Sequence, residues 1–364
     1  MSKLSKNYNT EALVRYARKL GFGEIHTCID KETGLHAIIA IHSTKRGPAI
    51  GGCRFKTYRS TGAAIKDVIR LGYMMTMKAA VSQLPNGGAK AVILKPKNMD
   101  KIDREKLFYR FGQFVDSLNG RYITSLDVGT TTHDMDIIAK ATPYVIGATC
   151  THEHDVDPSP HTSLGILRGI QAAVKHQLQK DDLKNIHVAV QGAGHVAYTL
   201  IKHLTQLGAR VTACDINEKA IQRCVDEFGV TVVDPDKIYD VACDVFAPCA
   251  LGGIINLETM DQLQTSIIAG SANNQLAHAK YAELLRKKNI LYVPDYVINS
   301  GGLICASSAY HTHKTETADK QIEALYDTLL EIFKRSDALK QPTTAIADMI
   351  AHENLKDIDH EHIS

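Results

Sequence analysis

Two lysines in the first half of the chain stand where charged side chains are uncommon. Lys78 lies near the end of an apolar helical stretch, and Lys90 lies between a Gly-Gly-Ala turn and an apolar run at residues 91–94. An ammonium group in a low-dielectric interior is costly, so a buried lysine needs a reason. Burial near a second cation lowers a lysine pKa towards neutrality, which suits general acid–base catalysis. We interpret Lys90 as a candidate acid–base group; the alternative is two lysines that snorkel to an ordinary surface.

Asp127, in the segment SLDVGTT, is a candidate proton-transfer partner, although alone it reads as a loop aspartate. The elements that must position these side chains follow from hydrophobic periodicity. Residues 61–80 have apolar side chains at helical spacing, and Pro-Asn-Gly-Gly at 85–88 is a turn signal. Strands are predicted over residues 35–41, 91–94 and 122–124, the last leading into Asp127.

A second candidate site is the glycine-rich turn Gly192-Ala193-Gly194-His195-Val196-Ala197. The first glycine permits a tight strand-to-helix turn, and the second lets the backbone approach a pyrophosphate. That group then lies at a helix N-terminus, where free N–H groups and the helix dipole favour an anion. Ala197 allows close packing of helix against strand. A structural turn with no ligand is the alternative.

Asp215 strengthens the dinucleotide interpretation. It ends the next predicted strand, 23 residues after Gly192. A carboxylate there accepts hydrogen bonds from the adenosine ribose hydroxyls and repels a 2′-phosphate. No arginine follows Asp215 closely, so the pattern favours NAD over NADP.

Strand-like and helical stretches alternate through the second half, which is typical of βαβ units and a parallel sheet. The sequence therefore predicts an α/β protein of two domains around a cleft. We expect residues 1–148 to form a substrate-binding and catalytic domain and residues 149–334 to form a Rossmann-like dinucleotide-binding domain. An irregular, proline-containing segment at 142–160 separates them. A helix about residues 335–364 packs back on the first domain, although the tail from His352 is polar and expected to fray.

Composition excludes several classes of protein. A formal net charge of +2 gives no argument for a nucleic-acid or membrane partner. No run of about 18 apolar residues is present, and the polar start lacks the apolar segment of a secretory signal. The eight cysteines form no C-x-x-C pair and are expected to be reduced thiols, which indicates the cytoplasm. The cluster at residues 152–155 and the pair His311 and His313 match no metal-site spacing, so no metal is expected.

Ten segments occur in an order that resembles a known family. They are GPAIGGCRF, YMMTMKAA, PNGGAKAVI, LNGRYIT, LDVGTTTHDMDII, GAGHVA, CDIN, FAPCALGGIIN, AGSANNQL and PDYVINSGG. This set is similar to the family of leucine, phenylalanine, valine and glutamate dehydrogenases, over about residues 35–326. The resemblance implies an NAD-dependent enzyme that converts an L-amino acid to its 2-oxo acid and ammonia, and that assembles as a homo-oligomer.

The resemblance also implies roles for the three residues introduced first. Lys78 binds the substrate α-carboxylate as a fixed charge. Lys90 is the general acid–base that handles the attacking water and the carbinolamine, and Asp127 shuttles protons on the opposite side. Hydride passes from the substrate Cα to NAD, water adds to the iminium, and ammonia leaves.

Further contacts are implied in the same way. Backbone at Gly51 and Gly52 lies near the substrate, and Asn274 reaches its carboxylate. Thr162 and Asn299 hold the nicotinamide end of the cofactor. Other implied cofactor contacts are Ile216, Cys249, Ala250 and Asn273.

The predicted pocket for the substrate side chain is apolar. Where the glutamate enzymes have a lysine for the substrate γ-carboxylate, this chain has Ile50, and their assisting serine aligns with Ala306. A pocket of Ile50, Leu303 and Ala306 leaves a carboxylate unpaired, which disfavours glutamate. Leucine is favoured, with valine and isoleucine also accepted. Because Ala306 is small, an aromatic substrate, phenylalanine or tryptophan, is the alternative.

Two residues depart from the family pattern. Leu126 replaces the usual glutamate before the catalytic aspartate, which removes a charge beside Asp127. Ala89 replaces the third glycine before Lys90 and strains this segment if the position needs a positive φ. These departures favour a second hypothesis, a catalytically silent homologue that binds NAD or an amino acid, whereas retention of both lysines and Asp127 favours an active enzyme.

Overall fold

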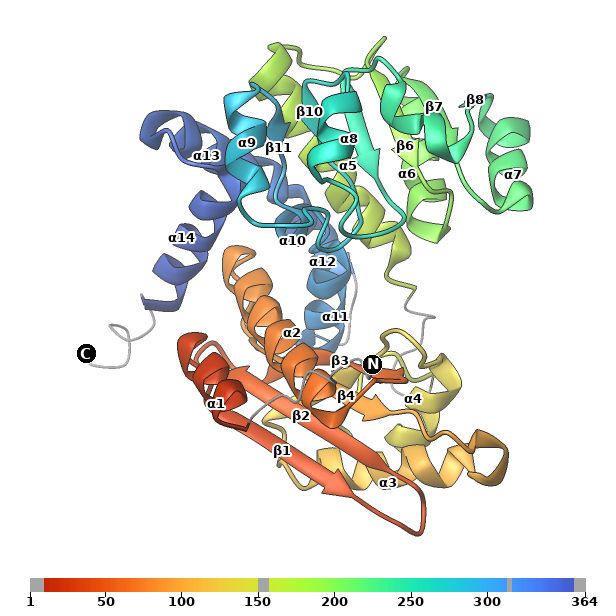
Figure 1. Ribbon diagram of the computed structural model, residues 1–364, viewed down its shortest axis with the longest axis vertical. Coiled ribbons are helices and arrows are strands. Elements are labelled where there is room, and N and C mark those ends of the chain that lie inside the picture. Colours follow the sequence, from red (N-terminus) through yellow and green to blue (C-terminus); the bar gives the residue numbers. More distant parts are fainter. Residues whose placement is uncertain (1–9, 150–156, 313–315, 357–364) are drawn as a thin grey trace, which may run out of the picture. The chain divides into compact units, whose positions relative to one another are not determined.

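The computed structural model describes residues 10–149, 157–312 and 316–356 and divides the chain into two units (Figure 1). Unit 1 comprises residues 1–156, 309–313 and 354–364, and unit 2 comprises residues 157–308 and 314–353. Each unit has its own β-sheet. The predicted α/β class is therefore confirmed.

Unit 1 is built on a five-stranded sheet in the order β1-β2-β4-β3-β5. Its strands are β1 (Glu24–Ile29), β2 (His36–Ser43), β3 (Ala49–Lys56), β4 (Gly87–Leu94) and β5 (Tyr122–Ser125). β2 is antiparallel to β1 and β4, whereas β3 is parallel to both β4 and β5. Its helical segments are α1 (Thr10–Lys19), α2 (Thr61–Val81), η1 (Met99–Lys101), α3 (Arg104–Asp116) and α4 (Thr132–Ala139).

The two faces of this sheet are covered by different helices. Because successive side chains of a strand point to opposite faces, β2 contributes to two cores. Ile39 belongs to the cluster that contains Phe108 of α3 and Met135 of α4. Ile38 belongs to the cluster that contains Val68 of α2. Burial on both faces explains why residues 35–41 read as a continuous apolar run.

Helix α2 lies directly against β4. Ser60 caps its N-terminus by accepting a hydrogen bond from the Ala63 N–H. At Gly88 of β4, a side chain would collide with the backbone of Thr76. At Gly72 of α2, a Cβ would lie only 3.0 Å from the Ala40 carbonyl oxygen of β2. Glycine at these positions brings the helix close to the strand that carries Lys90.

We expect Gly88→Ala to destabilise the protein by about 1–3 kcal/mol, because its Cβ meets helix backbone that cannot move without shifting α2. Chemical denaturation followed by circular dichroism measures this. Gly23→Ala is the matched control, since nothing lies within 4 Å of its Cβ position. An equally small change in both variants would contradict the close approach.

Unit 2 is built on a six-stranded sheet in the order β11-β10-β9-β6-β7-β8, in which every pairing is parallel. Its strands are β6 (His187–Gln191), β7 (Arg210–Cys214), β8 (Thr231–Val232), β9 (Val245–Pro248), β10 (Ile267–Ile268) and β11 (Leu291–Tyr292). Renumbered from β6, this is the strand order 6-5-4-1-2-3 of a Rossmann fold. The predicted Rossmann-like half is confirmed.

In unit 2, helical segments alternate with the strands from β6 to β11, one helix precedes β6, and five helices follow β11 (Figure 1). The helical segments are α5 (Ser159–Leu178), α6 (His195–Gln206), α7 (Glu218–Phe228), η2 (Pro235–Asp240), α8 (Leu257–Gln262), α9 (Tyr281–Lys287), α10 (Asp295–Ile298), α11 (Gly301–Thr312), α12 (Glu316–Glu323), α13 (Leu325–Leu339) and α14 (Thr343–Lys356). The last residues of α11 and α14 group with unit 1.

The expectation that the tail frays from His352 is wrong for residues 352–356, which complete α14. Asn354 explains this order. Its side-chain amide donates to the Ala80 carbonyl oxygen at 2.9 Å, and its own carbonyl oxygen accepts from Arg46 Nη1 at 2.9 Å. Residues 357–364 lie outside the described part of the chain.

Candidate active site

Lys90 lies in β4 of unit 1 and its side chain is only 8% exposed. Its Nζ lies 3.2 Å from Oδ2 of Asp127, which follows β5. Burial lowers the pKa of Lys90 below the ordinary lysine value, and the negative charge of Asp127 opposes this effect. A buried lysine with a lowered pKa and one carboxylate partner is able to take up and release a proton.

Glycine and threonine fix the position of Asp127. A Cβ on Gly52 of β3 would collide with the Leu126 carbonyl oxygen and lie 2.9 Å from Asp127 Cβ. The segment after β5 therefore lies directly on β3. The Asp127 N–H donates to the Thr130 hydroxyl at 2.9 Å. The Thr130 hydroxyl in turn donates to the Cys53 carbonyl oxygen at 3.2 Å.

Arg54, which the sequence analysis did not single out, is the second partner of Asp127. Its Nε donates to Asp127 Oδ2 at 2.8 Å, and its Nη1 donates to Asp67 of α2 at 3.1 Å. Burial acts to raise the pKa of Asp127, but Lys90 and Arg54 outweigh it and hold that pKa below the ordinary value. The sequence contained one signal for Arg54. It lies two positions after Gly52, so in a strand both residues lie on the same face.

The other predicted substrate residues of unit 1 lie on the same elements. Lys78 is partly buried in the last turn of α2, the helix that packs on β4. Gly51 and Ile50 lie in β3, where Ile50 is 1% exposed and a side chain at Gly51 would collide with the Ala89 carbonyl oxygen. The structure thus brings Asp127 into contact with Lys90 and with the backbone at Gly52, and it places Lys78 on the helix that packs on β4.

The two departures from the family pattern have structural explanations. Ala89 is an ordinary strand residue of β4, paired with Ile41, and its φ is not positive, so the expected strain is absent. Leu126 packs against the core cluster of unit 1 that contains Ile39. A leucine there is held by apolar contacts.

The glycine-rich turn of unit 2 connects β6 to α6. Gly192 has φ +104°, which only glycine adopts readily, and Gly194 is the N-cap of α6 with no side-chain cap. His195 and Val196 begin the helix, and Ala197 is 1% exposed, as close packing requires. The free N–H groups at this terminus suit a phosphate.

Asp215 follows β7 and lies against this turn. Its carboxylate accepts from the Ala193 N–H at 2.6 Å and from the Asn217 N–H at 2.7 Å. Ile216 beside it is 91% exposed, an uncommon position for an isoleucine. An acidic group and an exposed apolar side chain after β7 fit the ribose and the adenine of a dinucleotide.

Predicted cofactor residues also follow the other strands of the sheet. Cys249 and Ala250 follow β9, and a Cβ on Gly192 would lie 3.1 Å from Ala250 Cβ. Asn273 follows β10, and its Oδ1 accepts from Asn299 Nδ2 at 2.8 Å. Ligands of open parallel sheets bind at the carboxyl ends of the strands, so the residues present fit a dinucleotide.

The remaining predicted residues lie in loops and helices of unit 2. Asn274 has φ +53°, and its carbonyl oxygen accepts from the Gly253 N–H at 2.7 Å. Thr162 donates to the Pro158 carbonyl oxygen at 2.8 Å in the first turn of α5. Leu303 is 8% exposed and Ala306 is half-buried, both in α11.

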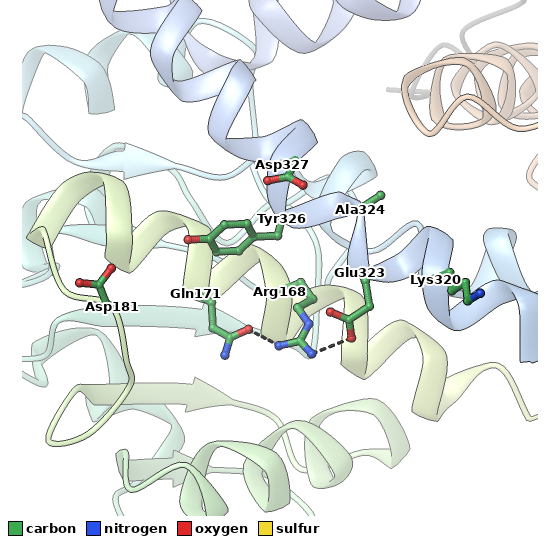
Figure 2. A pocket seen from close by; sticks show the side chains of 8 residues that line it. All are labelled: Arg168, Gln171, Asp181, Lys320, Glu323, Ala324, Tyr326 and Asp327. Atoms are coloured by element: carbon green, nitrogen blue, oxygen red, sulfur yellow. Dashed lines mark hydrogen bonds and ion pairs between the residues drawn. The ribbon is translucent and has the colours of Figure 1, made fainter.

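One polar hollow in unit 2 contains none of the predicted site residues. It lies between α5 and the pair α12 and α13 (Figure 2). Arg168 points into it and donates to Gln171 Oε1 and to Glu323 Oε1, each at 2.6 Å. Its central arginine is therefore already paired with two side chains of the hollow.

Neither a metal site nor a membrane span is found in the described ranges. Within residues 10–149, 157–312 and 316–356, no three His, Cys, Asp or Glu side chains group as metal ligands do. In the same ranges, no helix is long and apolar enough to cross a membrane. The histidine-rich cluster at 152–155, and His313, lie outside the described residues.

Comparisons with known proteins agree with this geometry. Residues 23–144 match the family model described as Glu/Leu/Phe/Val dehydrogenase, dimerisation domain. Residues 158–222 and 214–357 match the model described as Glutamate/Leucine/Phenylalanine/Valine dehydrogenase.

Individual relatives cover nearly the whole chain. A leucine dehydrogenase of Thermoactinomyces intermedius is 47% identical over 94% of this chain and 93% of its own. An L-tryptophan dehydrogenase of Nostoc punctiforme is 43% identical over 94% of this chain and 96% of its own. The crystal structure of L-tryptophan dehydrogenase from that organism superposes with a TM-score of 0.85 at 40% identity, covering 95% and 99%. This chain belongs to the Glu/Leu/Phe/Val dehydrogenase family and is an amino-acid dehydrogenase that uses a nicotinamide cofactor.

Proposed function

We propose that this enzyme catalyses the reversible, NAD-dependent oxidative deamination of an apolar L-amino acid, with leucine preferred and valine and isoleucine accepted. The products are the 2-oxo acid and ammonia. The observation that carries the proposal is the buried pair of Lys90 and Asp127, 3.2 Å apart, in a member of this family. A protein that only bound its ligands would have no need of a buried acid–base pair.

The proposed mechanism gives each residue of unit 1 one task. Lys78, a fixed cation, binds the substrate carboxylate, with Asn274 as a second contact. Neutral Lys90 takes a proton from the water that attacks the substrate carbon. Asp127 passes protons to and from the departing amine, while Gly51 and Gly52 offer backbone beside the substrate. NAD, when bound, supplies the hydride acceptor.

Leucine is proposed because the predicted side-chain pocket is apolar. Ile50, Leu303 and Ala306 provide no partner for a charged side chain, and a substrate carboxylate would lose its hydration without compensation. The 47% identity to a leucine dehydrogenase supports the same choice. The small side chain of Ala306 and the 43% identity to a tryptophan dehydrogenase favour an aromatic substrate as the second candidate.

NAD is proposed over its 2′-phosphorylated form because of Asp215, which lies against the glycine-rich turn. A carboxylate at this position repels a 2′-phosphate. The pyrophosphate is assigned to residues 192–197. The nicotinamide end is assigned to Thr162 and Asn299, the adenine side to Ile216, and further cofactor contacts to Cys249, Ala250 and Asn273.

We further propose that residues 1–148 serve catalysis and oligomerisation, and that residues 149–334 bind the cofactor. The match of residues 23–144 to a model described as a dimerisation domain supports a homo-oligomer. The seven cysteines in the described residues are free thiols, which supports a cytoplasmic location.

The test is the rate of NADH formation at alkaline pH with L-leucine, L-valine, L-phenylalanine, L-tryptophan and L-glutamate, each with NAD and with NADP. We expect the highest kcat/KM for leucine with NAD and a value at least about 100-fold lower for glutamate. A higher kcat/KM for phenylalanine or tryptophan would instead support the second candidate, an aromatic amino-acid dehydrogenase. No turnover, despite measurable NAD binding, would leave a silent homologue.

A further inference from the structure

Arg54 of β3 pairs with two carboxylates of unit 1, Asp67 in α2 and Asp127 after β5. Its Nε donates to Asp127 Oδ2 at 2.8 Å, and its Nη1 donates to Asp67 Oδ2 at 3.1 Å. Asp67 is itself fixed by the Tyr58 hydroxyl, at 2.8 Å, and by Arg70 Nη2, at 3.0 Å. The side chains of Arg54, Asp67 and Asp127 are each only 18–19% exposed.

The two oxygens of the Asp127 carboxylate differ in their contacts. Oδ2 faces both Arg54 Nε and Lys90 Nζ. Among the described residues, none bonds to Oδ1. A carboxylate fixed through one oxygen keeps its other oxygen at a defined place, where it can serve a reacting group.

We propose that Arg54 is a positioning residue of this dehydrogenase: anchored by Asp67, it fixes Asp127 through Oδ2 beside Lys90 and leaves Oδ1 for the substrate. This inference rests on the proposed function, because it assigns Asp127 a task in deamination. Asp67 lies in α2, the helix that also carries Lys78. The contacts Asp67–Arg54–Asp127 therefore connect this helix to the aspartate that follows β5.

An arginine suits this task better than a lysine. Its planar guanidinium presents donors in a fixed fork, so it holds two carboxylates at once without losing its charge. Burial acts to lower the pKa of Arg54, but Asp127 and Asp67 outweigh it and raise that pKa further above neutrality. The cation is permanent at any working pH.

Arg54 also acts on the charge of Lys90. The ionisable groups that bear on Lys90 are Asp127, after β5, and Arg54 and Cys53, both in β3. Burial raises the pKa of the Cys53 thiol to about 12, so it stays neutral. Removing Arg54 takes away a cation that disfavours protonated Lys90, so the pKa of Lys90 rises. The activity that depends on neutral Lys90 then appears at higher pH.

The test compares Arg54→Gln and Arg54→Lys with the wild type on leucine and NAD. We expect Arg54→Gln to lower kcat about 30- to 100-fold, with KM for leucine changed less than about threefold, and to move the rising limb of the pH–rate profile to higher pH. Arg54→Lys keeps a charge but not the fork, so it restores the pH limb and leaves kcat low. Unchanged kcat and an unchanged pH limb in both variants would overturn the proposal.

Arg110→Gln is the control, because Arg110 also pairs with an aspartate of unit 1, Asp30 at 3.0 Å, although its side chain is more exposed than that of Arg54 (34% against 18%). It is expected to lower stability without moving the pH limb. A double-mutant cycle with Asp127→Asn tests the route of action: Arg54→Gln changes kcat less than about twofold when Asp127 is already lost. Full multiplication of the two effects would show that Arg54 does not act through Asp127.

One readout does not need turnover. The pH dependence of Lys90 acetylation by acetic anhydride, followed by peptide mass spectrometry, reports the Lys90 pKa directly. It is expected to move to higher pH in Arg54→Gln and to stay unchanged in Arg110→Gln. If the wild type deaminates no amino acid, the proposed function fails, and this shift still tests whether Arg54 controls Lys90; an absent shift overturns that control.

Discussion

Lys90→Met is expected to lower kcat for leucine about 10³-fold or more and to remove the alkaline rise of the pH–rate profile. Methionine keeps the length and apolar stem of the side chain but cannot hold a proton. In the wild type, burial lowers the pKa of Lys90, so the neutral form accumulates as the pH rises through that lowered value. Oxidative deamination needs that neutral base, and therefore speeds up over the same interval. Steady-state NADH formation between pH 7 and pH 11 measures both effects.

Lys97→Met serves as the control, because Lys97 is an exposed lysine of the same unit, close to β4 in sequence. It is expected to keep wild-type kcat and the wild-type pH profile. Binding of NAD to Lys90→Met, measured by calorimetry, is expected to match the wild type. If Lys90→Met retained more than a tenth of the wild-type kcat, the assignment of Lys90 as the acid–base group would be wrong.

The sequence predicted local motifs well because each is contained in one strand–turn–helix segment. The helix expected over residues 61–80 is observed as α2, Thr61–Val81. The turn at Gly192 lies between β6 and α6 as expected, and Asp215 follows β7. In these segments, glycine conformation, helix capping and strand propensity all favour the same structure.

Strand β3 was not predicted, although it lies between β4 and β5 in the sheet of unit 1. Two consecutive glycines, Gly51 and Gly52, weaken strand propensity and hide the alternation of its side chains. The reason for these glycines is tertiary: backbone of β4 and of the Leu126 segment passes too close for a side chain. No local pattern contains that information.

Arg54 was missed for the same reason. It is 13 residues from Asp67 and 73 from Asp127 in sequence, and only the parallel pairing of β3 with β5 brings it to the aspartate. Once β3 is known to be a strand, Gly52 and Arg54 lie on one face, and a buried arginine on that face needs carboxylate partners. The resemblance indicated Lys90 and Asp127. Arg54, which joins Asp127 to α2, could be identified only once the strand order of the sheet was known.

Asp127→Asn is the second change with a large expected effect. We expect kcat for leucine to fall about 10²–10³-fold, because the amide cannot accept and release the proton. The asparagine also removes the negative charge that raises the Lys90 pKa, so two cations, Lys90 and Arg54, face a neutral group. The pKa of Lys90 falls further, and the residual activity rises with pH at a lower pH than in the wild type. This shift is opposite in sign to that of Arg54→Gln.

Asp30→Asn is the control for Asp127→Asn, since Asp30 pairs with Arg110 at 3.0 Å in the same unit without contact to Lys90. It tests whether loss of an aspartate–arginine pair alone changes the profile, and it is expected to leave the pH limb in place. Acetylation of Lys90 as a function of pH supplies the independent measurement. A limb that moved to higher pH in Asp127→Asn would mean that Lys90 is controlled by charges other than this pair. Opposite shifts in Asp127→Asn and Arg54→Gln would instead establish that the pKa of Lys90 responds to both the Asp127 carboxylate and the Arg54 guanidinium. Lys90 and Arg54 contact the same oxygen of that carboxylate, Oδ2.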